Sequence, residues 1–182
     1  MGNSEYILKM KNITKRFSGV VALSGVSLKL RPATVHALMG ENGAGKSTLM
    51  KCLFGIYHKD EGEIFLNGEN VHFNGTMDAI EHGISMIHQE LYPQRFLSVM
   101  ENVWVGRLPV KHGLVDYKAM YEKTQKLLKE LDINLDPKAK VGDLSVSQMQ
   151  CVEIVRAVSF NSKVIIMDEP TSSLTDNEVE HL

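Results

Sequence analysis

The amino-acid sequence predicts an α/β fold, and three observations carry this prediction. Short apolar runs of strand length recur through the first half of the chain and once more near its end. A glycine-rich loop stands between one of these runs and a helical pattern. A long segment rich in Met, Lys, Glu and Leu, with no strand pattern, interrupts this order from about residue 91 to residue 161.

The first strands are expected at residues 6–10 and 26–30, where apolar and polar side chains alternate as in half-buried antiparallel strands. The apolar run 35–39 predicts a buried parallel strand, and the pattern of 47–54 predicts a helix. Further strands are expected at 63–66, 84–87 and 164–167, the last fully buried because its apolar run is uninterrupted. Asn67-Gly68 predicts a hairpin toward residues 71–73.

Amphipathic patterns predict helices at 120–131 and 148–160. We therefore expect one domain, in which residues 1–90 plus 156–182 form an α/β core. Residues 91–155 form an inserted helical subdomain. The chain ends inside a helix-like stretch, so we expect a C-terminally truncated domain.

Composition excludes several classes of protein. The chain has 182 residues, of which 43% are hydrophobic and 23% charged, as in ordinary soluble domains. A formal net charge of -2 gives no electrostatic attraction to nucleic acid, so we expect no nucleic-acid partner. No apolar run is long enough to span a bilayer, and the first residues lack the pattern of a signal peptide.

The glycine-rich loop matches the phosphate-binding motif G-x-x-x-x-G-K-[ST]. It consists of Gly40, Glu41, Asn42, Gly43, Ala44, Gly45, Lys46, Ser47 and Thr48. Glycines allow positive φ, so that successive N–H groups and the start of the next helix face one anion. Lys46 can reach the β- and γ-phosphates, Ser47 can bind Mg²⁺, and Thr48 can reach the α-phosphate. A chance glycine turn is the alternative, but the strand before the loop and the helix after it favour a P-loop NTPase.

A second acidic site is expected at Asp168-Glu169, directly after the apolar run 164–167. Ligands of α/β sheets bind at the carboxyl ends of strands. Asp168 can therefore lie in the outer shell of Mg²⁺, and Glu169 can polarise the attacking water. Two acidic residues after a strand are common and by themselves predict no function. Together with the phosphate loop upstream, they predict a magnesium and catalytic site.

The order of further motifs resembles one P-loop family, the ABC ATPases. Residues 144–148 (LSVSQ) resemble the ABC signature L-S-G-G-Q and lie upstream of Asp168, as they do in that family. Gln89 resembles the Q-loop glutamine, and residues 172–175 resemble the D-loop. Phe17 resembles the aromatic residue that stacks on adenine.

The resemblance implies a RecA-like core with a small antiparallel β subdomain and a helical subdomain. It implies ATP and Mg²⁺ as ligands, with ATP bound between the phosphate loop of one domain and the signature of another. Catalytic roles are implied for Glu169, Gln89 and Lys46, and magnesium contacts for Ser47, Gln89 and Asp168. ATP contacts are implied for Phe17, residues 40–48, Ser145 and Gln148.

Several segments, among them 88–91 (HQEL), 101–107 (ENVWVGR) and 169–175 (EPTSSLT), resemble the tandem ATPases of bacterial monosaccharide importers of the galactose/methyl galactoside or ribose type. This implies ATP hydrolysis that powers sugar import, from the cytoplasmic face of the cell membrane. The implied partners are membrane permease subunits, a second nucleotide-binding domain of the same polypeptide and, indirectly, a periplasmic or extracellular sugar-binding protein. This fragment is expected to bind nucleotide without efficient turnover. The alternative is a soluble ABC ATPase that is not coupled to transport.

One departure from the family's motifs and several residues with two possible roles qualify this prediction. Val146-Ser147 replace the two glycines of the family's signature, so we expect the ATP site that this signature completes to be weakened. Ser145 and Gln148 could cap a helix as well as contact nucleotide. Phe17 could be a packing residue, and Trp104 could be either a core residue or an anchor for a membrane subunit.

Overall fold

The computed structural model describes residues 5–87 and 93–168. Gln89, Glu169 and residues 172–175, which the sequence analysis singled out, lie outside the described residues. The chain divides into two compact units, the first reaching His82 and the second beginning at Gly83. Across the described ranges, no helix has the length and apolar character needed to cross a membrane.

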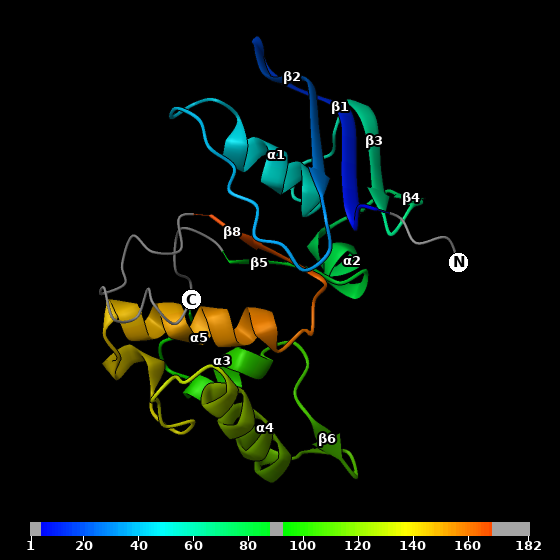
Figure 1. Cartoon of the computed structure of the whole chain (residues 1–182). Coiled ribbons are helices and arrows are strands. Elements are labelled where there is room, and N and C mark those ends of the chain that lie inside the picture. Colours follow the sequence, from blue (N-terminus) through cyan, green and yellow to red (C-terminus); the bar gives the residue numbers. More distant parts are fainter. Residues whose placement is uncertain (1–4, 88–92, 169–182) are drawn as a thin grey trace. The chain divides into compact units, whose positions relative to one another are not determined.

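An antiparallel sheet forms the first unit, with the strand order β2-β1-β3-β4 (Figure 1). Its strands are β1 (Leu8–Phe17), β2 (Val20–Leu30), β3 (Glu61–Leu66) and β4 (Glu69–Val71). The predicted hairpin is confirmed, because Leu66 pairs with Glu69 across a two-residue turn. Asn67 and Gly68 in that turn have φ of 52° and 87°, as a type I′ turn requires.

Two helices belong to the first unit, α1 (Lys46–Leu53) and α2 (Thr76–Glu81). α1 lies beside β2 (Figure 1). It buries Leu49, Cys52 and Leu53, which confirms the helix predicted at 47–54. Burial of this apolar face is the main force that holds α1 in place, since a helix of eight residues is not stable by itself.

The strand predicted at residues 35–39 is wrong. No strand is assigned from residue 34 to residue 40, and Val35 and Met39 are 102% and 88% exposed. An apolar run becomes a buried parallel strand only when neighbouring strands supply hydrogen-bond partners on its edges. None of the pairings between described strands includes these residues, so the run stays irregular.

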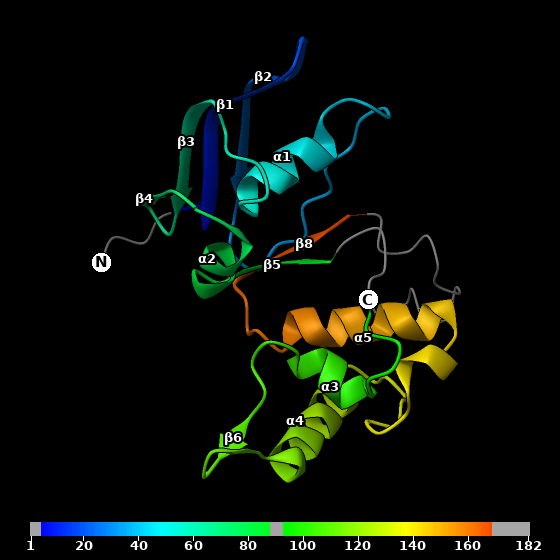
Figure 2. The ribbon, with the colours of Figure 1, turned by 180° about the vertical axis from the view of Figure 1, so that it is seen from behind.

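The second unit contains the parallel pair β5 (Ile84–Ile87) and β8 (Val164–Met167), which lie side by side in Figure 2. Both strands were predicted. The prediction that 164–167 is fully buried is wrong, because Ile165 and Met167 are 36% and 40% exposed. Within the described part of the chain β8 pairs with β5 only, and its side chains alternate between buried and exposed.

In the described part of the second unit, the helices are α3 (Val99–Trp104), α4 (Tyr117–Glu130) and α5 (Val146–Val158), with a 3₁₀ turn at Val141–Asp143. They share an apolar core made of Val99, Val103, Leu128, Val141, Met149, Val152 and Val155. The two predicted helices are thus present, although α4 begins three residues earlier than expected. A short hairpin of β6 (Val110–Lys111) and β7 (Leu114–Val115) corrects the expectation that this region has no strands.

Arg107 joins the ends of two helices of this helical part, α3 and α5. Its guanidinium donates to the carbonyl oxygens of Ser159 and Val103 at 2.9 and 3.1 Å, near the ends of α5 and α3. It also lies 4.5 Å from the ring centroid of Trp104 and 3.8 Å from that of Phe160. Burial and the neighbouring Arg156 lower the pKa of Arg107 to about 10, so it stays charged at neutral pH.

Trp104 is a packing residue of this same cluster. Its indole Nε1 donates to Thr124 Oγ1 on α4 at 3.0 Å, and the ring packs against the apolar core. Of the two interpretations left open by the sequence, the structure supports the core residue.

Arg107→Ala is expected to lower the free energy of unfolding by about 2–4 kcal/mol, because it removes charged hydrogen bonds and two ring contacts. Urea denaturation measures this change. Arg156→Ala is the control: its ion pair with Glu153 is 3.8 Å long and partly exposed. We expect the control to lose less than about 1 kcal/mol. Equal losses in the two variants would contradict the role given to Arg107.

Candidate functional site

The loop that precedes α1 has the backbone conformation that a phosphate-binding loop needs. Gly43 and Gly45 have φ of 84° and 88°, in the left-handed region that favours glycine. The turn from Glu41 to Ala44, which contains Gly43, is closed by a hydrogen bond from Ala44 N to Glu41 O at 3.1 Å. Gly45 is the N-cap of α1, so the loop leads directly into the first turn of the helix.

Gly45 is also packed against β2. A Cβ atom at this position would lie 2.7 Å from the carbonyl oxygen of Ala22 and 2.8 Å from Leu23 Cδ2. At Gly43 a Cβ atom would meet nothing within 4 Å. The close contact at Gly45 therefore fixes the loop against the sheet, whereas Gly43 supplies only its backbone conformation.

Gly45→Ala is expected to lower the free energy of unfolding by about 2–4 kcal/mol, from left-handed strain and overlap with β2. Gly43→Ala, the matched control in the same loop, has the strain without the overlap and should lose about 1–2 kcal/mol. Thermal and urea unfolding of both variants measure the difference. A Gly45 variant no less stable than the Gly43 variant would show that the contact with β2 does not hold the loop.

Lys46 is the first residue of α1, and its side chain folds back over this loop. Its Nζ donates to the carbonyl oxygens of Gly40 and Glu41 at 2.7 and 2.9 Å. The ammonium group is thereby held over the loop, where it can exchange these carbonyls for phosphate oxygens.

The first turn of α1 adds to this positive end. Gly45 has no side chain that could cap the helix, and the first turn contains no acidic residue. The N–H groups and the dipole of the helix therefore favour an anion at this point. Ser47 and Thr48, both half-buried, place their hydroxyl-bearing side chains on the same turn.

Phe17 is the last residue of β1, and its side chain is 41% exposed. Its ring lies edge to face with that of Tyr57, with the centroids 5.1 Å apart and the planes at 75°. Lys15 Nζ lies 5.4 Å from the centroid of the Phe17 ring. Tyr57 was not identified from the sequence, because the contact joins residues forty positions apart and no local pattern marks it.

In the second unit, Asp168 follows β8 directly. Its backbone N–H donates to the carbonyl oxygen of Ile87, the last residue of β5, at 3.2 Å. The carboxyl ends of the two parallel strands therefore meet at one edge, with Ile87 opposite Met167. Two of the predicted residues, Gln89 and Glu169, come just after these ends but lie outside the described residues.

Ser145 and Gln148 form a capping box at the start of α5. Gln148 N donates to Ser145 Oγ at 3.2 Å, and Ser145 N donates to Gln148 Oε1 at 3.0 Å. This pair explains why α5 begins at Val146, two residues earlier than expected. The predicted capping role is confirmed. The side chain of Val146 is 56% exposed, so the bulk that replaces a glycine lies at the surface.

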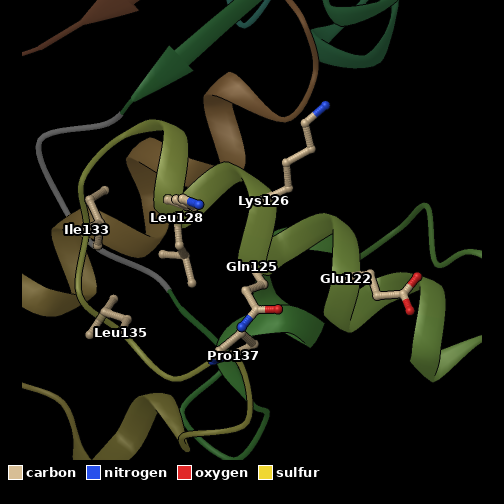
Figure 3. A pocket seen from close by; sticks show the side chains of 8 residues that line it. Glu122, Gln125, Lys126, Leu128, Ile133, Leu135 and Pro137 are labelled. Carbon is tan, nitrogen blue, oxygen red and sulfur yellow. The ribbon is translucent and has the colours of Figure 1, made fainter.

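A cavity of about 600 Å³ lies elsewhere in the second unit, between α4 and the segment that follows it. Leu128, Ile133 and Leu135 gather at this hollow in Figure 3. Its remaining lining residues are Glu122, Gln125, Lys126, Lys129 and Pro137. None of these belongs to the predicted phosphate, base or signature residues.

Comparison with known proteins decides the family. The family model described as "ABC transporter" matches residues 23–172, which include the phosphate loop, residues 145–148 with the capping box of α5, and Asp168. The chain belongs to the ABC transporter family of ATP-binding domains. The predicted membership of the ABC ATPases is thereby confirmed.

The curated relatives of this ABC domain include galactose/methyl galactoside import proteins. The galactose/methyl galactoside import ATP-binding protein MglA of Clostridium tetani is 62% identical over 186 residues, covering 100% of this chain and 37% of that protein. The protein of the same name from Escherichia coli K12 is 57% identical over 180 residues, covering 99% of this chain and 36% of that protein. This chain thus spans a little more than a third of the length of these relatives.

Solved ABC structures confirm the fold. A nucleotide-free ATP-binding cassette from an ABC transporter superposes with a TM-score of 0.85 and 29% identity, covering 97% of this chain and 74% of that chain. The ADP conformation of the cassette MJ1267 gives a TM-score of 0.83 and 30% identity, covering 98% of this chain and 74% of that chain. The predicted α/β fold of P-loop NTPase type, with its antiparallel β subdomain, is therefore correct.

Proposed function

We propose that this ABC domain binds MgATP on residues 40–48 and that the longer protein to which it corresponds hydrolyses ATP to drive import of a monosaccharide. The observation that carries the nucleotide site is the geometry of the loop. Two glycines have left-handed conformations, Lys46 is held over the loop, and an uncapped helix begins behind it. These features together fit a bound polyphosphate.

The residues of the loop fit a magnesium–nucleotide complex. Magnesium is usually held by one or two protein oxygens together with phosphate oxygens of the nucleotide. Ser47 on the first turn of α1 supplies a hydroxyl, and Asp168 and Gln89 are the further oxygen donors that we propose. Bound Mg²⁺ would neutralise charge on the phosphates. Lys46 adds a positive charge at the β- and γ-phosphates, and Thr48 reaches the α-phosphate.

The remaining roles complete the proposal. Phe17 stacks on adenine, and Glu169 orients the attacking water, with Gln89 beside the nucleotide. Ser145 and Gln148, which cap α5, contact the nucleotide of a partner domain. We also propose the division into an α/β core at 1–90 plus 156–182 and a helical subdomain at 91–155.

The transport function rests on the names of the relatives, which are import ATP-binding proteins for galactose and methyl galactoside. We propose membrane permease subunits and a second nucleotide-binding domain as direct partners, and an external sugar-binding protein as an indirect one. We therefore propose that the protein lies at the cytoplasmic face of the membrane. Residues 1–182 by themselves are proposed to bind nucleotide without efficient turnover.

An assay of ATP hydrolysis by the whole protein tests this function. Hydrolysis is measured with and without the permease, and with galactose or ribose bound to the sugar-binding protein. Hydrolysis stimulated by one sugar supports import. Hydrolysis that neither the permease nor a sugar changes would favour the second candidate, a soluble ABC ATPase. Absence of hydrolysis in every combination contradicts both.

A further inference from the structure

The segment that follows α1 is fixed by the end of that helix. The backbone N–H groups of Ile56 and Tyr57 both donate to the carbonyl oxygen of Lys51, at 2.9 and 3.1 Å. Gly55 turns the chain with φ of 76°, and a Cβ atom there would lie 2.7 Å from the carbonyl oxygen of Gly75. The helix that begins at the phosphate loop therefore also determines where the ring of Tyr57 lies.

Tyr57 holds one side of the ring of Phe17. The two rings meet edge to face at 5.1 Å, the arrangement that aromatic pairs prefer. Phe17 nevertheless stays 41% exposed at the end of β1. A pair that served only the core would be buried, whereas this contact positions a ring that keeps much of its surface available.

Asp60 holds the backbone just before Phe17. Its carboxylate accepts a hydrogen bond from Arg16 N at 2.6 Å and one from Lys15 Nζ at 3.0 Å, and its own N–H donates to Thr14 O at 2.9 Å. The bonds from Arg16 and Lys15 also lower the pKa of Asp60 below its ordinary value. Residues 14–16 are thus tied to the same short segment that carries Tyr57.

We propose that Tyr57 and Asp60 are positioning residues that fix Phe17 for stacking on the nucleobase. This inference rests on the proposed binding of MgATP. The segment 55–60 links the two ends of the nucleotide site: α1 starts at the phosphate loop, and the residues after α1 set the position of the base-stacking ring. Tyr57 and Asp60 act through Phe17 and are not expected to touch the nucleotide themselves.

The test separates the base from the phosphates. Magnesium tripolyphosphate offers the phosphates of ATP without a base, so each variant is titrated with MgATP and with magnesium tripolyphosphate. Tyr57→Leu should lower the affinity for MgATP about 3- to 10-fold, the range expected for loss of one aromatic contact, and leave tripolyphosphate unchanged. Asp60→Ala should show the same selectivity. Tyr57→Phe keeps the aromatic ring and should bind MgATP with wild-type affinity.

Two controls make the result specific. Tyr121→Leu removes a half-buried tyrosine of the second unit and should change neither affinity. The double variant Phe17→Ala/Tyr57→Leu should bind MgATP as weakly as Phe17→Ala and no more weakly, because Tyr57 acts through Phe17. Unfolding curves of all variants show whether each remains folded.

The outcomes distinguish this inference from the proposed function. If wild-type protein binds neither ligand, the proposed function fails. If it binds both, and Tyr57→Leu lowers both affinities equally or lowers neither, the positioning role is overturned. The same holds if Phe17→Ala leaves the affinity for MgATP unchanged, since the ring then does not stack on the base.

Discussion

Lys46→Ala is expected to lower the affinity for MgATP by about 100-fold or more, because a charged donor to the phosphates is worth roughly 3 kcal/mol. The fold should be unaffected. Among the described residues, Lys46 Nζ bonds to carbonyl oxygens of its own loop, Gly40 and Glu41, for which water can substitute. Titration calorimetry with MgATP, accompanied by circular dichroism, measures both properties.

Lys126→Ala on α4 is the matched control, because it removes the same charge from the second unit. Its ion pair with Glu130 is 3.6 Å long and exposed, so neither affinity nor stability should change measurably. If the Lys46 variant binds MgATP with wild-type affinity, the proposal that this loop binds the phosphates is wrong. Equal loss in both variants would mean that net charge, rather than the loop, determines binding.

Glu169→Gln is expected to stop ATP hydrolysis by the whole protein, with a decrease of about 10²- to 10⁴-fold, and to leave MgATP binding intact. The amide keeps the shape of the side chain but cannot accept the proton of the attacking water. Phosphate release under steady-state conditions measures hydrolysis, and titration with MgATP measures binding. Asp168→Asn at the neighbouring position serves as the comparison.

The variants at Asp168 and Glu169 should differ in how their MgATP binding depends on Mg²⁺. Asp168→Asn should weaken the dependence of binding on Mg²⁺, because we place that carboxylate in the outer shell of the metal. Glu169→Gln should leave this dependence unchanged. Hydrolysis at the wild-type rate in the Glu169 variant would show that another group orients the water.

Local chemistry explains which parts of the fold the sequence predicts. The hairpin at Asn67-Gly68 and the loop before α1 depend on left-handed glycines and on residues a few positions apart, so their patterns are visible along the chain. The capping pair Ser145 and Gln148 is visible for the same reason. The β6–β7 hairpin also turns on adjacent residues with left-handed φ, His112 and Gly113 at 52° and 80°, although no strand is expected there from the sequence.

Contacts between distant residues account for the remaining errors. The apolar run at residues 35–39 has the composition of a buried strand, but composition cannot show whether a neighbour pairs with it. The prediction that β8 is fully buried fails for the same reason. Ile165 and Met167 are exposed because burial of a strand face depends on the elements that pack against it, which composition does not show. The contact of Phe17 with Tyr57 and the bonds of Arg107 to Ser159 link positions far apart in the chain.

The most direct test of the central claim is titration of residues 1–182 with MgATP, followed by competition with magnesium tripolyphosphate and by assay of released phosphate. We predict saturable binding of one MgATP, displaced by tripolyphosphate, with little or no release of phosphate. If the chain is folded by circular dichroism and MgATP still produces no saturable binding, residues 40–48 do not form a nucleotide site, and the proposed function is wrong.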